Sequence, residues 1–204
     1  AIWGIEKGSS PTSLDISINN FDENISKNPI ICLLSIIDDD KNDSHIYNLV
    51  SGLGDNDKHL FVIEGNYLKI LESPNHEKKS SYDIRIESVD SFQNSIAKDF
   101  NFYVNDINDK PIDFYLSEYN FDENINPGSI IANIYAIDED ISDQHAFWLM
   151  PGFIESIDNK FFRIEGNNLR IKDKPDFETK DSYSIVINVT DQYGESFECK
   201  FSEH

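Results

Sequence analysis

The chain has 204 residues, with 17 Lys or Arg against 38 Asp or Glu, and a formal net charge of -21. This balance argues against a nucleic-acid partner, because binding to phosphates requires a basic surface. A disordered acidic chain is also disfavoured, because 39% of the residues are hydrophobic and they recur in short regular runs. Two explanations of the acidity remain: a solubilising surface, or sites for hard divalent cations, which bind oxygen ligands.

Short segments with strand-like patterns follow one another along the chain. Residues 14–18, 82–86 and 183–189 alternate between apolar and polar side chains, and 29–37 form an apolar run rich in β-branched residues. Alternation with a period of two places one face of a strand in a core and the other in water. The run 29–37 predicts a buried strand from its β-branched content.

Turn signals separate these segments. The triplet Glu-Gly-Asn occurs at 64–66 and at 165–167, each time between short apolar runs, and predicts a hairpin turn. We expect about seven short strands in each half of the chain, a pattern typical of antiparallel Greek-key sandwiches. No stretch has helical spacing. The sequence therefore predicts an all-β fold of Ig-like β-sandwich domains.

The sequence repeats itself after about one hundred residues. The run Phe-Asp-Glu-Asn-Ile occurs at 21–25 and again at 121–125, and Pro11 recurs as Pro111. Further matches follow in the same order, which chance does not supply. We therefore predict two homologous domains in tandem. The expected segments are an upstream tail or linker at 1–10 and repeats at 11–109 and 110–204.

Acidic residues gather at the ends of the predicted strands and not along their faces. In the second half they are Glu123, Asp138, Asp140, Asp176, Glu178 and Asp191. Between the halves, residues 105–111 combine several oxygen donors with a proline, which is an unusual composition for a flexible tether. This distribution favours cation binding over a uniformly acidic surface.

These motifs resemble those of the cadherin superfamily, and particularly the cadherin-like tandem repeats of bacterial surface proteins. The connector 106–111 is similar to the family's Asp-x-Asn-Asp-Asn-x-Pro, and 136–140 to its Ala-x-Asp-x-Asp. The segment 176–178 resembles its Asp-Arg-Glu, and 190–194 its Ala-x-Asp-x-Gly. The likeness extends from Pro11 over nearly the whole chain.

The resemblance implies that Ca²⁺ binds between the two repeats. The implied ligands are Glu23, Glu77, Asp106, Asn108, Asp109, Asp138, Asp140 and Asp191. Two outer half-sites are also implied, formed by Asp38, Asp40 and Asp90 in the first repeat and by Glu123, Asp176 and Glu178 in the second. We expect these half-sites to be empty or weak in this chain.

Three departures from the family pattern lower the negative charge offered to metal. Asn75 stands where the family has an aspartate. The connector is one residue short, with Lys110 near the family's last asparagine. The segment 6–10 lacks the Asp-x-Asn-Asp motif, so any junction before the first repeat is degraded.

The resemblance implies a Ca²⁺-rigidified adhesion or spacer module of a large cell-surface or secreted protein, extracellular and not an enzyme. Its partners would be neighbouring repeats of the same chain, and another cell-surface protein or a glycan. Two alternatives are a glycan- or protein-binding module, with Trp148 as a contact, and an accessory domain of a secreted enzyme. No apolar stretch is long enough to span a bilayer, so we expect no membrane insertion of this fragment.

Overall fold

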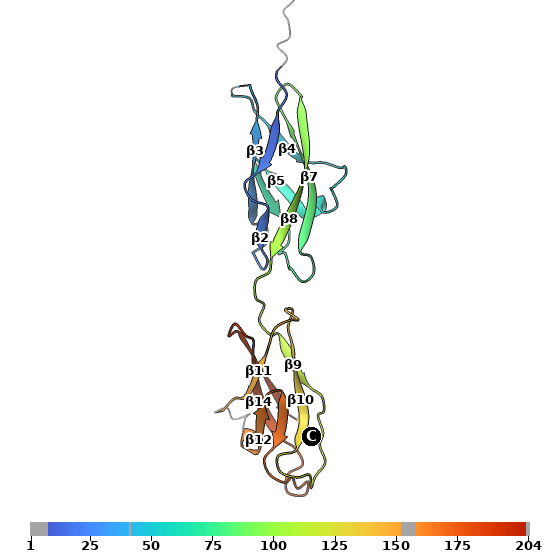
Figure 1. Ribbon diagram of the computed structural model, residues 1–204, viewed down its shortest axis with the longest axis vertical. Coiled ribbons are helices and arrows are strands. Elements are labelled where there is room, and N and C mark those ends of the chain that lie inside the picture. Colours follow the sequence, from blue (N-terminus) through green and yellow to red (C-terminus); the bar gives the residue numbers. More distant parts are fainter. Residues whose placement is uncertain (1–7, 41, 152–157, 203–204) are drawn as a thin grey trace, which may run out of the picture. The chain divides into compact units, whose positions relative to one another are not determined.

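The computed structural model describes residues 8–40, 42–151 and 158–202. It divides into two compact units, Ala1–Ile107 and Asn108–His204. Residues 1–7 of the expected upstream tail lie outside the described residues. Both units are β-sandwiches, as the alternating patterns predicted (Figure 1).

The first unit contains two four-stranded sheets, with the strand orders β1-β3-β6-β5 and β2-β8-β7-β4. Its strands are β1 (Ser13–Ile16), β2 (Asn20–Asp22), β3 (Ile30–Ile37), β4 (Ile46–Leu49), β5 (Phe61–Glu64), β6 (Tyr67–Ile70), β7 (Ser81–Val89) and β8 (Ser95–Asn105). A 3₁₀-helix, η1 (Lys58–Leu60), leads into β5.

The second unit contains a four-stranded sheet, β12-β13-β10-β9, and a three-stranded sheet, β11-β14-β15. Its strands are β9 (Asp113–Leu116), β10 (Ile130–Ile137), β11 (Ala146–Leu149), β12 (Phe162–Glu165), β13 (Asn168–Ile171), β14 (Ser184–Thr190) and β15 (Ser196–Ser202). The 3₁₀-helix η3 (Asn159–Phe161) again leads into a strand.

One strand pairing differs from the expected antiparallel pattern. β2 runs parallel to β8, with Phe21 opposite Val104. The counterpart of β2 in the second unit, residues 120–122, forms no strand. All other strand pairs of the described residues are antiparallel, as predicted for a Greek-key sandwich.

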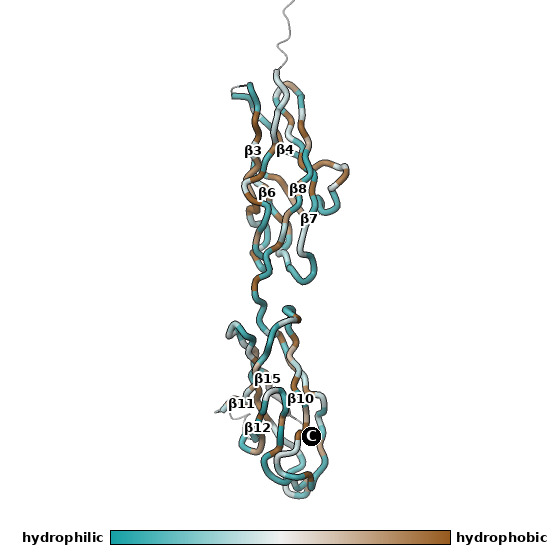
Figure 2. The backbone as a smooth tube through the Cα atoms, viewed as in Figure 1, coloured by the Kyte–Doolittle hydropathy of each residue, from teal (hydrophilic) through white to brown (hydrophobic). Residues whose placement is uncertain are grey.

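Each unit has its own hydrophobic core, formed by the inward-facing positions of its two sheets. In β7, buried and half-buried residues alternate along the whole strand, and Ile84 and Ile86 are fully buried. Phe162 and Ile187 have the same role in the second unit. Apolar segments are confined largely to the strands in Figure 2. Burial of these side chains drives the closure of each sandwich.

The predicted hairpin turns are confirmed. Glu64 pairs with Tyr67 across a two-residue turn, and Gly65 in that turn has a φ of 64°. Gly166 has a φ of 61° in the equivalent turn. Glycine is favoured at such positions because a Cβ atom makes positive φ costly.

A buried carboxylate before η1 was not predicted from the sequence. Asp57 is 7% exposed, and its Oδ2 accepts a hydrogen bond from the N–H of Asp83 at 2.9 Å. Lys79 Nζ lies 3.2 Å from Asp57 Oδ1 and 5.3 Å from the centre of the Tyr82 ring. Such a buried charge is stabilised by its lysine and by the backbone N–H.

The second unit repeats this arrangement. Asp158 Oδ2 accepts from the N–H of Ser184 at 2.7 Å, and Lys180 Nζ lies 3.2 Å from Asp158 Oδ1. Lys180 Nζ is also 5.1 Å from the centre of the Tyr183 ring. No helix within 8–40, 42–151 or 158–202 has the length and apolar character needed to cross a membrane.

Because each core belongs to one unit, we expect a core substitution to destabilise that unit alone. Phe102 is 0% exposed, and Phe102→Ala should lower the free energy of unfolding of the first unit by about 3–5 kcal/mol. Urea denaturation followed by amide NMR would measure both units separately. Phe92→Ala is the control, because Phe92 is 46% exposed and its loss should cost about 0.5 kcal/mol or less.

Candidate metal centres at the ends of the units

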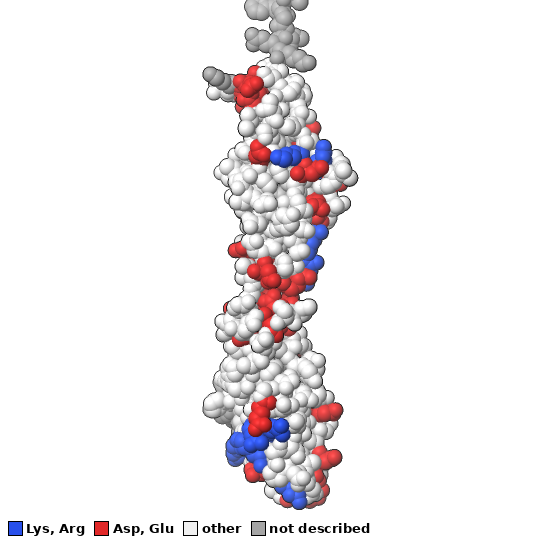
Figure 3. Space-filling view, viewed as in Figure 1, with Lys and Arg blue, Asp and Glu red and all other residues white. Residues whose placement is uncertain are grey.

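Acidic side chains gather at the ends of each unit (Figure 3). In the first unit, Glu23 follows β2 directly and is 2% exposed. Its Oε2 accepts a hydrogen bond from the N–H of His76 at 2.8 Å, and its Oε1 accepts from the N–H of Ile107 at 2.8 Å. Two backbone donors thus satisfy this buried carboxylate, and they fix the start of the connector to the first unit.

Glu77 and Asp106 lie close to this carboxylate. His76 Nδ1 is 3.2 Å from Glu77 Oε1 and 3.6 Å from Asp106 Oδ2. Burial raises the pKa of Glu77, and the neighbouring Glu23 raises it further by its charge and by a hydrogen bond. The first unit therefore concentrates carboxylates that repel one another where the connector begins.

At the start of the second unit, the motif after β10 organises the rest of the connector. Asp138 Oδ1 accepts from the N–H of Asp140 at 3.1 Å, and Asp138 Oδ2 lies 2.7 Å from His145 Nε2. Asp140 Oδ2 accepts from the N–H of Asp109 at 2.7 Å. The spacing Asp-x-Asp thus lets one aspartate orient the loop and the other hold the connector.

Asp191 follows β14 and is 5% exposed. Its Oδ1 accepts from the N–H groups of Tyr193 and Glu195 at 2.8 and 2.9 Å, and its Oδ2 accepts from Asn108 Nδ2 at 3.0 Å. Burial alone would raise the pKa of Asp191, but these bonds, with one from the N–H of Gly194, outweigh it and lower the pKa. Asp191 therefore keeps its negative charge while buried.

Asp143 completes this cluster, although the sequence motifs did not identify it. Ligand atoms of Asp138, Asp143 and Asp191 lie within 4.8 Å of one another. Burial raises the pKa of Asp143, and the charges of Asp140, Asp138 and Asp191 raise it further. Its Oδ1 accepts from Gln192 Nε2 at 2.7 Å. The arrangement provides several anionic oxygens without a nearby lysine or arginine partner among the described contacts.

Two buried oxygens in this cluster test whether a cation would fit here. Among the described residues, Asn108 Oδ1 and Asp143 Oδ2 are buried and have no hydrogen-bond partner. Buried polar atoms without a partner are uncommon in proteins and cost free energy. Carboxylate and amide oxygens are ligands that Ca²⁺ accepts, so the residues present fit this ion.

The opposite end of the first unit repeats part of this geometry. Asp40 Oδ2 accepts from the N–H of Ser9 at 2.6 Å, and Asp38 Oδ2 lies 3.0 Å from His45 Nε2. Ser9 thus occupies the position that Asp109 has in the second unit, where its N–H donates to Asp140. Asp38, Asp43 and His45 group together there.

Asp90, the third residue of that expected half-site, is engaged by an asparagine. Asp90 Oδ2 accepts from Asn94 Nδ2 at 2.8 Å, and Asp90 Oδ1 accepts from the N–H groups of Phe92 and Asn94 at 2.8 and 2.7 Å. The side-chain amide of Asn94 therefore donates to Asp90 as the side-chain amide of Asn108 donates to Asp191 in the second unit. The carbonyl of Gly8 also accepts from Asn94 Nδ2, at 3.3 Å.

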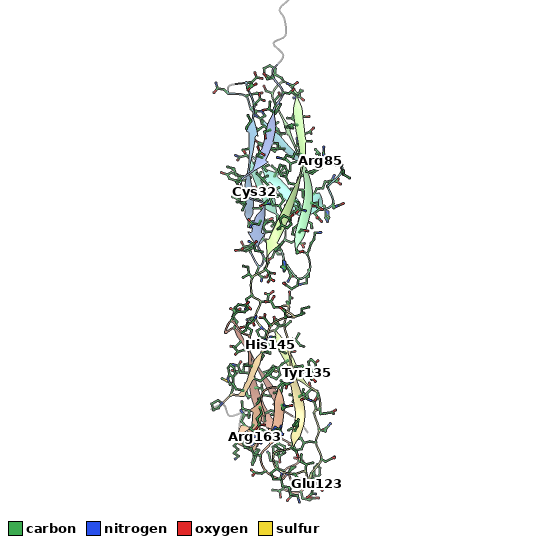
Figure 4. All side chains as sticks on the ribbon, in the orientation of Figure 1. Cys32, Arg85, Glu123, Tyr135, His145 and Arg163 are labelled. Atoms are coloured by element: carbon green, nitrogen blue, oxygen red, sulfur yellow. The ribbon has the colours of Figure 1, made fainter. Side chains whose placement is uncertain are left out.

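The far end of the second unit carries the other expected half-site. Ligand atoms of Glu123, Asp176 and Glu178 lie within 4.8 Å of one another, and all three residues are exposed. Glu123 Oε2 accepts from the N–H of Phe177 at 3.2 Å, the counterpart of the bond from His76 to Glu23. Figure 4 shows Glu123 and His145 at opposite ends of this unit.

The predicted ligands are grouped within each unit as follows. The first unit holds Glu23, Glu77 and Asp106 together, and the second holds Asn108, Asp109, Asp138, Asp140 and Asp191. Sequence analysis missed Asp43, Asp143 and Glu195, whose Oε2 accepts from Asn108 Nδ2 at 3.3 Å. A signal for two of them existed, because Asp43 and Asp143 occupy the same position in the repeat, two residues before His45 and His145.

No protein-family model matches the chain. A relative from Drosophila melanogaster, the Fat-like cadherin-related tumor suppressor homolog, is 30% identical over 162 residues, which are 76% of this chain and 3% of that protein. Human protocadherin-24 EC1-2 has a TM-score of 0.67 at 15% identity, covering 94% of this chain and 96% of that one. Protocadherin gamma B2 extracellular cadherin domains 3-6 have a TM-score of 0.66 at 13% identity, covering 94% and 47%.

These likenesses support membership of the cadherin superfamily. The cadherin-like fold expected from the sequence is therefore observed in both units. The fly and human proteins are eukaryotic, so they give no support to the expected bacterial type of repeat. This cadherin-like chain spans only a small part of its fly relative.

The raised pKa of Asp143 has a consequence for metal-free protein. A raised pKa means that the folded state holds the proton more tightly than the unfolded state, so this group lowers stability as the pH rises through its pKa. Asp143→Asn removes that charge and keeps an oxygen for Gln192. We expect the variant to melt at a higher temperature than the parent at pH 7 in chelator.

The increase in melting temperature should become smaller toward pH 3, where the Asp143 carboxylate of the parent is protonated in both the folded and the unfolded state. Thermal melts from pH 3 to 7 with chelator would measure it. A variant that melts at a lower temperature throughout this range would contradict the assigned repulsion.

Proposed function

We propose that Ca²⁺ binds where the two repeats meet and fixes them to each other. The proposed repeats are 11–109 and 110–204. The proposed ligands are Glu23, Glu77, Asp106, Asn108, Asp109, Asp138, Asp140 and Asp191, with Asp143 added from the geometry of the second unit. The observation that supports this most directly is the buried Asp143 Oδ2, which has neighbouring carboxylates but no hydrogen-bond donor among the described residues.

The connector itself supports a shared site. Glu23 accepts from the N–H of Ile107, and Asp140 accepts from the N–H of Asp109. These two nitrogens are only two residues apart along the chain, a separation of at most about 7 Å. Glu23 and Asp140 therefore accept hydrogen bonds from backbone N–H groups that lie two residues apart in the connector.

Electrostatics explains why a cation would stiffen this region. Two unit charges 4 Å apart repel by about 4 kcal/mol at an effective dielectric constant of 20. Ca²⁺ would remove this repulsion and accept six to eight oxygens in a flexible geometry. Mg²⁺ would fit less well, because it requires a compact octahedron and retains its waters. Without the ion, repulsion would favour separation of the two sets of ligands.

In this proposal the chain is a Ca²⁺-stiffened adhesion or spacer module of a larger extracellular, cell-surface or secreted protein, and it is not an enzyme. The cadherin likeness and the position of the carboxylates at the ends of sandwiches support it. Its partners would be neighbouring repeats and another cell-surface protein. The outer half-sites would bind Ca²⁺ weakly, because the first contains His45 and Asn94 and the second is exposed.

The glycan-binding alternative rested on Trp148. This residue is 38% exposed in β11, and its indole N–H donates to Met150 Sδ at 3.3 Å. The indole donor that would orient a sugar is therefore used within the unit. The geometry favours the spacer function over this alternative.

Ca²⁺ should stabilise the protein more than Mg²⁺ does. At a Ca²⁺ concentration of about 100 times the Kd, binding adds about 2.7 kcal/mol to the free energy of unfolding. Asp138→Ala should remove most of this increment, whereas the exposed Asp173→Ala should retain it. Thermal melts of all three proteins in chelator, Mg²⁺ and Ca²⁺ would test this, and an equal increment in Asp138→Ala would contradict the ligand assignment.

Stiffening is tested separately by small-angle X-ray scattering. The distribution of interatomic distances should be narrower in Ca²⁺ than in chelator, because the ion would restrict the connector. Asp109→Asn should give the broader distribution in both conditions. Identical curves for the parent protein in Ca²⁺ and chelator would refute stiffening even if the ion binds.

A further inference from the structure

The second unit carries an outward-facing sheet surface that differs from its counterpart in the first unit. On the sheet β12-β13-β10-β9, the residues that alternate with the buried positions point away from the core. They include Arg163 on β12, Arg170 on β13, Tyr135 on β10 and Tyr115 on β9. Arg163 and Tyr135 are labelled in Figure 4. These four side chains therefore belong to one face of a single sheet.

The two arginines of this face share one carboxylate. Arg163 and Arg170 are directly opposite each other on their strands. Arg163 Nε lies 3.2 Å from Glu165 Oε1, and Arg170 Nε lies 2.8 Å from Glu165 Oε2. Within the described residues, Glu165 is the one carboxylate at ion-pair distance from either guanidinium. Lys and Arg also gather over β12 in Figure 3, although the net charge of the chain is -21.

This excess of positive charge is costly for the isolated chain. Like charges directly opposite each other on neighbouring strands lower stability. Arg170 Nη1 donates to the carbonyl of Gly128 at 2.7 Å, but Arg170 Nε is buried and makes no hydrogen bond among the described residues, so its contact with Glu165 is an ion pair alone. The Arg163 side chain is 49% exposed. Because arginine binds carboxylates through several N–H groups at once, a carboxylate from another molecule would balance the pair.

Two stacked tyrosines lie farther along the same face. Tyr115 and Tyr135 are opposite each other, and their ring centres are 5.1 Å apart with 22° between the ring planes. They are 45% and 43% exposed. Tyrosine and arginine are enriched in protein interfaces, where they contribute much of the binding energy. The stacked rings therefore offer an apolar platform beside the charged pair.

The strand register gives the distance between the arginines and the tyrosines. Arg170 is two residues from Asn168 on β13, and Asn168 is opposite Asn133 on β10. Tyr135 is two residues beyond Asn133 in the other direction. These four steps correspond to about 13 Å along the strands. Residues four apart in an extended peptide have the same separation and point to the same side, so one extended segment can contact both pairs.

The first unit balances its charges at the equivalent positions. Lys69 pairs one to one with Glu64. Asp15 and Ser35 are opposite each other where the second unit has its tyrosines, and Asp15 pairs with Lys98 at 2.9 Å. The same sheet thus forms without an unbalanced arginine and without an aromatic pair. These features are therefore not required by the fold.

We propose that this face of the second unit docks an acidic, extended segment of a partner protein. A carboxylate of the segment would bind between Arg163 and Arg170, and an apolar or aromatic side chain four residues away would lie on Tyr115 and Tyr135. The excess positive charge selects an acidic partner by charge complementarity. The inference deepens the proposed function by giving its partner protein a surface, and it does not depend on Ca²⁺.

The probe is a capped, threonine-rich peptide with one glutamate and a tyrosine four positions later, titrated into the full ¹⁵N-labelled chain in chelator. We expect saturable shifts in the amide signals of 113–117, 130–137 and 162–170, and none in those of 13–17, 30–37 and 61–69. A peptide with glutamine for the glutamate, or with the tyrosine three positions away, should bind about tenfold more weakly. Because no Ca²⁺ is present, failure of this titration would leave the Ca²⁺ melts and scattering as independent tests of the proposed function.

Arg163→Gln should weaken peptide binding about tenfold, because it removes charge-assisted hydrogen bonds. Arg85→Gln is the matched control, because Arg85 is the third arginine of the chain and pairs with Asp99 in the first unit. Tyr135→Ser should weaken binding by a similar factor. Tyr67→Ser should not, although Tyr67 is 44% exposed on the equivalent sheet of the first unit.

Absence of saturable shifts on β9, β10 and β12 would overturn the proposal. Equal losses in Arg163→Gln and Arg85→Gln would also contradict it, because they would indicate a general effect of charge. A heparin fragment that binds more tightly than the peptide, with no loss in Tyr135→Ser, would replace the protein partner with a sulfated polysaccharide. Shifts on the same strands that depend on protein concentration without peptide would replace it with a second copy of the chain.

Discussion

Backbone N–H groups hold the carboxylates at the ends of the strands, and the arrangement of each candidate site depends on these bonds. Glu23 is held by His76 and Ile107, and Asp140 by Asp109. A neutral donor positions a carboxylate without cancelling its charge. Asp57 shows the contrast, because Lys79 neutralises it and it belongs to the structural framework. The type of donor therefore separates structural carboxylates from those available to a cation.

Much of the fold could be predicted because it follows from local patterns. The alternation in β7 identifies its inward face, and Gly65 and Gly166 mark turns that need positive φ. Repetition of the motifs around Glu23 and Asp138 also located most acidic residues of the candidate sites. These inferences need only the spacing of residues in the sequence.

Features that depend on contacts distant in sequence were not predicted. The parallel pairing of β2 with β8 joins residues more than eighty positions apart. The ion pair between Asp158 and Lys180 forms only because the fold brings the two side chains together. Asp143 was missed because the family motif does not include it, although its position repeats that of Asp43, and the packing of Asp138 and Asp191 around it shows its place. Charge repulsion in such a cluster is a property of tertiary structure.

The two repeats have kept one framework while their end residues diverged, as the exchange of Asn108 for Asn94 beside equivalent aspartates illustrates. The separate hydrophobic cores have a mechanical consequence. When a pulling force acts on the ends of the chain, one sandwich can rupture while the other stays folded. Two cores that rupture separately would make the chain lengthen in discrete steps, and each step would dissipate work.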